Sequence, residues 1–262
     1  MDRLLELTSR AETDHFWFRG FRRFVAPALR RAASGRTNLT LLDCGCGTGY
    51  NLSLLAPYGR VHGMDLTAAG LEIAARRTAQ NTARGTTGNG APLAAPPLVR
   101  ADATRIPYRS ESFDVVTSFD MLQCVPDDQA AVREMARVLK PGGYLVATVA
   151  ALEMLHGDHS VLSEEVRRYT RAGMRRVLAQ AQLEEVRVTY AFGSTCPLVL
   201  GVRVAQRLWR GHAQAGDLEI TVPPAPVNAA LTALVMGEAA IAPYLPMPFG
   251  SSLVVLARKR QG

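Results

Sequence analysis

The chain has 262 residues, of which 30 are Lys or Arg and 23 are Asp or Glu, so its formal net charge is +7 and its pI is near 9.6. Hydrophobic residues make up 48% and charged residues 20% of the chain, which is ordinary for a globular protein and excludes an intrinsically disordered one. The positive charge alone admits nucleic acid, an anionic membrane or an acidic small molecule as a partner.

The cysteines and the apolar stretches limit the class of protein and its compartment. The four cysteines are scattered and contain no CxxC pair, so we predict neither a disulfide scaffold nor a metal site. The first residues lack the continuous apolar run of a signal peptide, and no uncharged stretch reaches the ~20 residues of a membrane span. We therefore expect a soluble, cytoplasmic protein with no transmembrane segment.

Strand-like and helical segments alternate along most of the chain. The first 36 residues have helical spacing and carry an aromatic cluster. Short apolar runs then predict strands at 39–44, 61–65, 98–101, 113–119 and 144–149, and helical spacing predicts helices at 67–80 and 127–139. Strands separated by helices of this length predict an α/β fold with a parallel sheet and right-handed crossovers.

The pattern changes after residue 150. Helical spacing returns at 170–181, 196–210 and 227–242, and strand patterns occur at 184–190 and 252–257. In the first of these strands, alternation places Val186, Val188 and Tyr190 on one side. A stretch rich in Gly, Pro and Thr at 83–97 is expected to be a surface insertion. We predict four parts: an N-terminal helical arm or lid (1–36), an α/β core (37–193), a helical cap insertion (194–246), and a closing strand with a basic tail (247–262).

A glycine-rich turn follows the first predicted strand and reads Asp43-Cys44-Gly45-Cys46-Gly47-Thr48-Gly49. Glycines between a strand and a helix let a ligand approach the backbone closely. A dinucleotide fingerprint needs Gly or Ala at the next position, where Tyr50 stands, and no phosphate-binding Gly-Lys-Ser/Thr follows. A GxGxG turn preceded by an acid fits a nucleoside ligand that lacks a pyrophosphate.

Two further acids end the next two predicted strands. Asp65 lies 22 residues after Asp43, the position from which a carboxylate accepts both ribose hydroxyls. Asp102 ends the third strand, where its carboxylate is suited to accept the amino group of adenine. Because open α/β sheets bind ligands at the carboxyl ends of their strands, the three acids and the glycine turn together predict a nucleoside site.

The motifs DCGCGTG, VHGMD, RADATRIPYRSESFDVVTSFDMLQCVPDD and LKPGGYLVAT resemble the class I S-adenosylmethionine-dependent methyltransferases of the small-molecule, type 11-like subgroup. The resemblance covers roughly residues 39–149. It implies a Rossmann-like sheet of seven strands, whose last strand at 252–257 inserts antiparallel beside 184–190. It also implies S-adenosylmethionine as the cofactor and S-adenosylhomocysteine as the product.

The same resemblance implies a set of cofactor-binding residues. Gly45, Gly47 and Gly49 would line the methionine part, Asp65 would hold the ribose, and Asp102 with Ala103 would contact adenine. The remaining expected cofactor contacts are Asp43, Cys46, Leu66, Asp120 and Arg19, the last pairing with the cofactor carboxylate from the N-terminal arm. Trp17 of the arm and Tyr169 are expected at the substrate.

The residues that would move a proton are less well defined by the resemblance. Many members of the fold have Asp-x-Leu-Glu-His-Val after the fourth strand, whereas this chain has Gln123 and Cys124 in place of Glu and His. The remaining candidates are Asp120 and two histidines that follow the fifth strand, His156 and His159. A histidine has an ordinary pKa suited to proton transfer near neutrality.

The predicted function is transfer of a methyl group, by in-line displacement, to a small-molecule acceptor such as a secondary metabolite, lipid or saccharide. No Asn/Asp-Pro-Pro-Tyr follows the fourth strand and the arginines are dispersed, so we expect no nucleic-acid partner. Two alternatives stay open: a lipid acceptor reached by peripheral membrane contact through 198–210, and a non-catalytic module that binds a cofactor or partner. The acceptor, its reacting atom, and the choice between monomer and homodimer stay undetermined.

Overall fold

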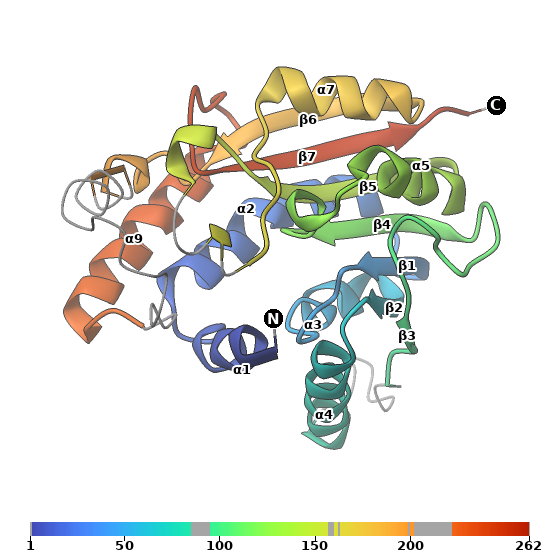
Figure 1. The fold of residues 1–262 in the computed structure, drawn as a ribbon, viewed down its shortest axis with the longest axis horizontal. Coiled ribbons are helices and arrows are strands. Elements are labelled where there is room, and N and C mark those ends of the chain that lie inside the picture. Colours follow the sequence, from blue (N-terminus) through green and yellow to red (C-terminus); the bar gives the residue numbers. More distant parts are fainter. Residues whose placement is uncertain are drawn as a thin grey trace.

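The computed structural model describes residues 2–84, 95–156, 160–161, 163–198, 200–201 and 222–261. Its centre is one seven-stranded sheet with helices on both faces (Figure 1). The strands are β1 (Leu39–Cys44), β2 (Gly59–Asp65), β3 (Leu98–Arg100), β4 (Phe113–Phe119), β5 (Leu139–Ala150), β6 (Leu183–Ala191) and β7 (Ser252–Lys259). Their order in the sheet is β3-β2-β1-β4-β5-β7-β6.

Only β7 runs against its neighbours, pairing antiparallel with both β5 and β6, while the other pairs are parallel. This confirms the predicted α/β fold with an antiparallel last strand. The helices are α1 (Asp2–Ala11), α2 (Phe16–Ala33), α3 (Leu52–Leu55), η1 (Ala56–Tyr58), α4 (Ala68–Arg84), η2 (Leu122–Cys124), α5 (Asp128–Val138), η3 (Glu153–Leu155), α7 (Arg171–Gln180) and α9 (Ala225–Ile241).

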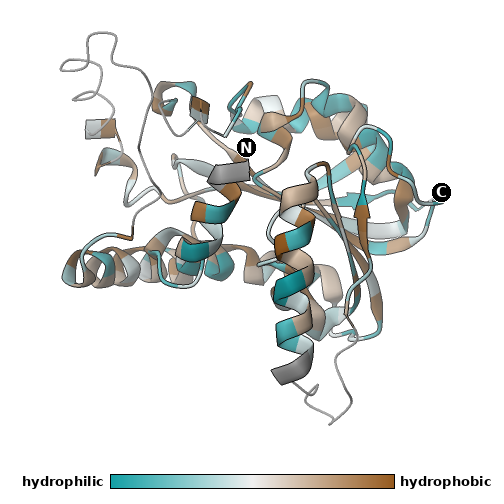
Figure 2. Ribbon diagram, turned by 60° about the horizontal axis from the view of Figure 1, so that its bottom comes forward, coloured by the Kyte–Doolittle hydropathy of each residue, from teal (hydrophilic) through white to brown (hydrophobic). Residues whose placement is uncertain are grey.

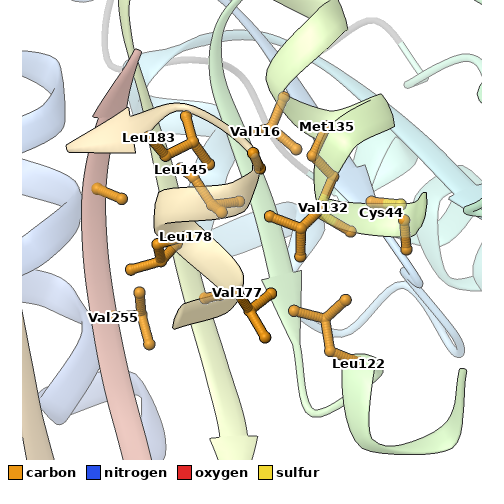
Figure 3. Close-up of a cluster of buried hydrophobic side chains, with 14 of the residues drawn as sticks. Cys44, Val116, Leu122, Val132, Met135, Leu145, Val177, Leu178, Leu183 and Val255 are labelled. Carbon is orange, nitrogen blue, oxygen red and sulfur yellow. The ribbon is translucent and has the colours of Figure 1, made fainter. Parts of the chain in front are cut away.

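Apolar side chains form a core on each face of the sheet. On one face, Val132 and Met135 of α5 and Val177 and Leu178 of α7 pack against the strands, with Val116 in the layer beneath them (Figure 3). On the other face, α2 and α9 cover the strands with a second buried cluster that contains several aromatic side chains. The parallel strands are therefore buried on both faces, as their β-branched runs predict.

Helices α2 and α9 lie side by side, although about 200 residues separate them in sequence (Figure 1). Asn228 in the first turn of α9 accepts a hydrogen bond from the backbone N–H of Phe16. The two helices are in contact at Gly20, because a Cβ there would fall 2.0 Å from a methyl of Val235. The glycine therefore sets the distance between the helices.

Helices α1 and α4 contact each other outside these two layers. Both carry hydrophobic residues interspersed with hydrophilic ones along their length, as an amphipathic helix does (Figure 2). The N-terminal arm thus consists of two helices, of which α1 lies on α4 and α2 lies on the sheet. No helix among the described residues is both long enough and apolar enough to span a membrane.

Two local predictions need correction. The strand predicted at 144–149 begins earlier, because β5 starts at Leu139, directly after α5 ends at Val138, and so includes Lys140 to Gly143. In β6, Val186 does not share a face with Val188 and Tyr190, because the register shifts between Glu185 and Arg187 and the extra residue turns to the other face. Most of the insertion at 83–97 and of the helix predicted at 196–210 lies outside the described residues.

Candidate functional site

The glycine turn has a backbone that only glycine adopts readily. Gly45, Gly47 and Gly49 have φ values of 81°, 49° and 72°. The turn is fastened to β2, since the N–H groups of Gly45 and Cys46 both donate to the carbonyl of Met64, at 2.7 and 2.9 Å. Cys46 itself is buried, with its sulfur near Gly63 of β2.

The surroundings of the glycines differ along the turn. A Cβ on Gly49 would fall 2.8 Å from the Cβ of Ala74 in α4, and one on Gly45 would fall 2.5 Å from the Cγ of Met121. These two glycines allow close packing of neighbouring elements. In contrast, a Cβ on Gly47 would meet nothing within 4 Å. The open side of the turn is therefore at Gly47.

Asp65 ends β2 directly beside that open side. Its Oδ2 accepts a hydrogen bond of 2.7 Å from the N–H of Gly47, and its Oδ1 accepts from the N–H and hydroxyl of Thr67, at 2.8 and 2.6 Å. The carboxylate thus joins the glycine turn to the start of α4. The next side chain, Leu66, is 61% exposed, which is unusual for a leucine between two packed elements.

Asp102 follows β3 on the neighbouring loop. Its Oδ1 accepts hydrogen bonds of 2.8 Å from both the N–H and the hydroxyl of Thr104, and its side chain is exposed. Ala103 is buried, and the backbone N–H of Ala101 donates to the carbonyl of Asp65 at 3.0 Å. Asp65 and Asp102 therefore lie on adjacent loops at the carboxyl edge of the sheet, as the sequence predicts.

Asp43 is placed differently from the other two acids. Its side chain is 1% exposed and accepts a 2.7 Å hydrogen bond from the hydroxyl of Thr117 in β4. Burial and, to a smaller extent, the nearby charge of Asp65 raise the pKa of Asp43 from 3.8 to about 7, against the lowering effect of the Thr117 hydrogen bond. The free protein therefore holds this carboxyl partly protonated at neutral pH.

Asp120 follows β4 and has a left-handed backbone, with φ of 51°. Its N–H donates to the carbonyl and the hydroxyl of Thr148, at 3.0 and 3.1 Å, so the turn is held against β5. Burial raises the pKa of Asp120 to about 7, opposed by a hydrogen bond from Thr148 and increased by the charge of Glu165. A carboxyl with this pKa can accept or release a proton near neutrality.

Gln123 and Cys124, the two departures from the family pattern, hold the same turn. Gln123 donates to the carbonyl of Asp120 at 3.0 Å and accepts from the N–H of Ala150 at 3.4 Å. The thiol of Cys124 contacts the carbonyl of Ser163, and burial raises its pKa to about 12. Cys124 therefore remains a neutral thiol at physiological pH and is not a proton acceptor.

An ion pair that the sequence analysis missed lies next to Asp120. A nitrogen of Arg168 is 2.9 Å from an oxygen of Glu165, and both side chains are more than nine-tenths buried. Arg168 also donates to the carbonyl of Ala151 and to the hydroxyl of Ser160, at 3.1 and 2.9 Å. The pair ties together the segment that follows β5, but its three-residue spacing gave no signal of proximity to Asp120.

A second missed network joins the N-terminal arm to the glycine turn. Glu12 is buried and accepts hydrogen bonds from the hydroxyl of Thr48 in the turn and from Arg77 in α4, at 2.6 and 2.7 Å. Arg77 also donates to the backbone carbonyl of Ser9 at 3.2 Å. Only the fold brings these residues together, because 65 positions separate Glu12 from Arg77.

Helix α2 approaches the turn through a different arginine from the predicted one. Arg22 lies 3.7 Å over the ring of Tyr50 and donates to the backbone carbonyl of the same residue. Arg19, one helical turn earlier, is exposed and near enough to influence the pKa of Tyr50. Trp17 stacks on Phe192, which follows β6, with ring centroids 5.4 Å apart and planes 11° apart.

The predicted proton acceptors and substrate residues after β5 are only partly described. His156 is half-buried and directly follows η3, whereas His159 lies outside the described residues. Tyr169, which is predicted to lie at the substrate, is buried in the core, and its hydroxyl donates to Asp128 at 2.6 Å. The residues that the fold does bring together are the glycine turn, Asp65 and Asp102.

Comparison with known proteins gives one family and a set of similar folds. Residues 42–147 match the model of a methyltransferase domain. A demethylmenaquinone methyltransferase of Staphylococcus aureus is 36% identical over 115 residues. That match covers 42% of this chain and 43% of the relative, so the chain matches less than half of the relative's length.

The similar solved structures have low sequence identity and show the fold. Phosphoethanolamine N-methyltransferase 2 of Haemonchus contortus, solved with S-adenosyl-L-methionine, is 18% identical, with a TM-score of 0.63 over 100% of this chain and 58% of that one. The [4+2]-cyclase SpnF is 22% identical, with a TM-score of 0.59 over 92% of this chain and 81% of that one. Proteins with different named reactions therefore share this fold.

Proposed function

Because this chain belongs to the class I S-adenosylmethionine-dependent methyltransferases, we propose that it binds S-adenosylmethionine at the glycine turn and transfers its methyl group to a small molecule. The observation that carries the proposal is the juxtaposition of the open side of the turn at Gly47 with the carboxylates of Asp65 and Asp102. A nucleoside needs such a combination, because its sugar and base offer hydrogen-bond donors to carboxylates.

The residues present fit the cofactor in shape and in charge. The space beside Gly47 admits a ligand against the backbone, and the exposed Leu66 offers an apolar contact for a base. Asp65 is proposed to hold the ribose, Asp102 with Ala103 the adenine, and the turn from Gly45 to Gly49 the methionine part. Arg19 and Trp17 are proposed to complete the site from α2, toward the cofactor carboxylate and the acceptor respectively.

The bound cofactor supplies a methyl group on a sulfonium and a thioether leaving group. The protein must orient the acceptor for in-line attack and exclude water from the methyl group. Asp120 is proposed to accept a proton from an acceptor that is protonated at working pH, because its pKa is about 7 and its turn is held by Gln123 and Thr148. His156 and His159 are proposed as further proton acceptors in the segment after β5.

Calorimetry tests the cofactor proposal directly. We expect S-adenosylmethionine and S-adenosylhomocysteine to bind the wild-type chain, and Asp65→Ala to weaken both by at least about tenfold, because it removes hydrogen bonds to a charged group. Glu72→Ala, a substitution in the exposed part of α4, is the matched control. Absence of binding to the wild-type chain, or equal binding by Asp65→Ala, would contradict the proposal.

One observation favours a second function without methyl transfer. The positions of the family Glu and His carry Gln123, which bonds to backbone groups of Asp120 and Ala150, and Cys124, which is a neutral thiol. The similar fold of SpnF, named as a [4+2]-cyclase, shows that the fold alone does not determine the reaction. Transfer of a labelled methyl group to any acceptor in a cell extract would exclude a module that only binds the cofactor.

A further inference from the structure

A cavity lies between α2, α9 and the β6–β7 edge of the sheet, away from the glycine turn. Its volume is about 460 Å³, which is within the range of small-molecule sites in proteins. Strands β4, β5 and β7 separate β6 from β1, so the cavity and the proposed cofactor site lie toward opposite edges of the sheet. The wall residues are Phe24, Pro27, Ala28, Arg31, Val186, Arg187, Thr189, Ala239, Ala242, Pro243, Val254 and Leu256.

The floor of the cavity is apolar and buried. Val254 and Leu256 of β7, Ala239 of α9 and Ala242 at the end of that helix line it, and each of these residues is less than 9% exposed. The facing positions on both helices include alanines, which are too small to fill the space between helix and sheet. Interiors of proteins are normally packed without voids of this size, so a cavity with such a floor is suited to an apolar ligand.

The mouth of the cavity is positively charged. Among the described wall residues, Arg31 in the last turn of α2 and Arg187 of β6 are the charged ones, and both are exposed. Arg187 donates to the carbonyls of Pro243 and Ala242, at 2.7 and 2.5 Å, which uses part of its guanidinium. A guanidinium has five N–H donors, so Arg187 can also bind a carboxylate.

The bulge in β6 builds one wall of the cavity. Regular alternation would place Val186 on the opposite face from Arg187 and Thr189. The register shift between Glu185 and Arg187 brings all three side chains to the cavity face. Bulges at a sheet edge commonly direct a side chain into a site, and this one adds an apolar residue beside the arginine at the mouth.

We propose that this cavity binds a single-chain anionic amphiphile of the fatty-acid class, with its hydrocarbon on the alanine-lined floor and its carboxylate at Arg31 and Arg187. The apolar floor is suited to the hydrocarbon chain. The two arginines are suited to the negative end, because no acidic residue is among the wall residues that the structure describes. This proposal does not depend on methyl transfer, because the described wall residues all lie outside the glycine turn and outside the loops that follow β2, β3 and β4.

Equilibrium dialysis with three ten-carbon probes tests the proposal: decanoate, decan-1-ol and decyltrimethylammonium. We expect saturable binding of decanoate to the full chain, about tenfold tighter than decan-1-ol, because only the carboxylate gains a charge-assisted hydrogen bond. Decyltrimethylammonium should bind most weakly of the three. No saturable binding of decanoate, or equal binding of decanoate and decyltrimethylammonium, would overturn the proposal.

Two variants locate the site. Arg31→Gln should reduce decanoate affinity to that of decan-1-ol and leave decan-1-ol binding unchanged, while Arg30→Gln, on the same helix but outside the cavity, should change neither. Ala239→Leu should weaken all three probes by filling the floor; its circular dichroism and melting temperature show whether it folds. If Arg30→Gln and Arg31→Gln behave alike, the carboxylate does not bind at this mouth and the proposal fails.

Discussion

Burial of Asp43 makes a specific prediction about the pH dependence of cofactor binding. The carboxyl lies beneath the glycine turn with its pKa raised to about 7, so in the free protein about half of the molecules carry it protonated at pH 7. The proposed cofactor is cationic, with a sulfonium and an ammonium group. A cation at the turn stabilises the carboxylate and lowers the pKa of Asp43, so binding releases a proton and strengthens as pH rises through about 7.

The size of the effect follows from the ionised fraction. With a pKa of about 7, roughly one eleventh of the Asp43 carboxyls are ionised at pH 6 and roughly ten elevenths at pH 8. If the bound state requires the carboxylate, the Kd falls about tenfold over this interval, and about half a proton is released on binding at pH 7. Calorimetry in two buffers with different ionisation enthalpies measures both quantities.

Variants separate Asp43 from other titrating groups. Asp43→Asn should remove most of the tenfold change, while any titration of the ligand itself is common to both proteins. Asp120 also has a pKa of about 7, so Asp120→Asn is the essential comparison and should leave the change in place. An equal pH dependence in the wild-type protein and in Asp43→Asn would refute the reasoning, because the buried carboxyl would then not sense the cofactor.

Three further outcomes are expected. Folding raises the pKa of Asp43 from 3.8 to about 7, so the stabilising contribution of its protonated carboxyl is complete below pH 3.8 and is lost as pH rises through 7. The wild type should therefore lose roughly 3 kcal/mol more stability between pH 5 and pH 8 than Asp43→Asn, as measured by urea denaturation. Arg77→Met leaves Glu12 buried without its cation and should cost about 3 kcal/mol of stability in the same assay, much of it recovered by adding Glu12→Gln. Gly49→Ala should lower the melting temperature more than Gly47→Ala. Both variants carry the ~1–2 kcal/mol cost of a left-handed alanine, but only Gly49→Ala adds a clash with Ala74. Gly47→Ala should chiefly weaken cofactor binding, as measured by calorimetry.

The sequence alone was sufficient for the sheet and for the grouping of the glycine turn, Asp65 and Asp102 at one edge of it. Strands and crossover helices have short-range periodicity, and parallel strands place their carboxyl ends at one edge, so the order of Asp65 and Asp102 along the chain predicts their proximity in the fold. The glycines at 45, 47 and 49 likewise encode a local backbone conformation, which depends on few distant contacts.

Tertiary structure decided which of these residues is enclosed and what supports them. The sequence pattern does not distinguish Asp43 from Asp65, since both lie at the carboxyl end of a predicted strand, but packing of β1 against β4 buries only Asp43 and raises its pKa. The contact of Glu12 with Arg77, the pairing of Glu165 with Arg168 near Asp120, and the cavity between α2 and α9 depend on how distant segments meet. Periodicity reports which side of an element is buried, whereas these partners are set by the positions of whole elements, which no local pattern contains.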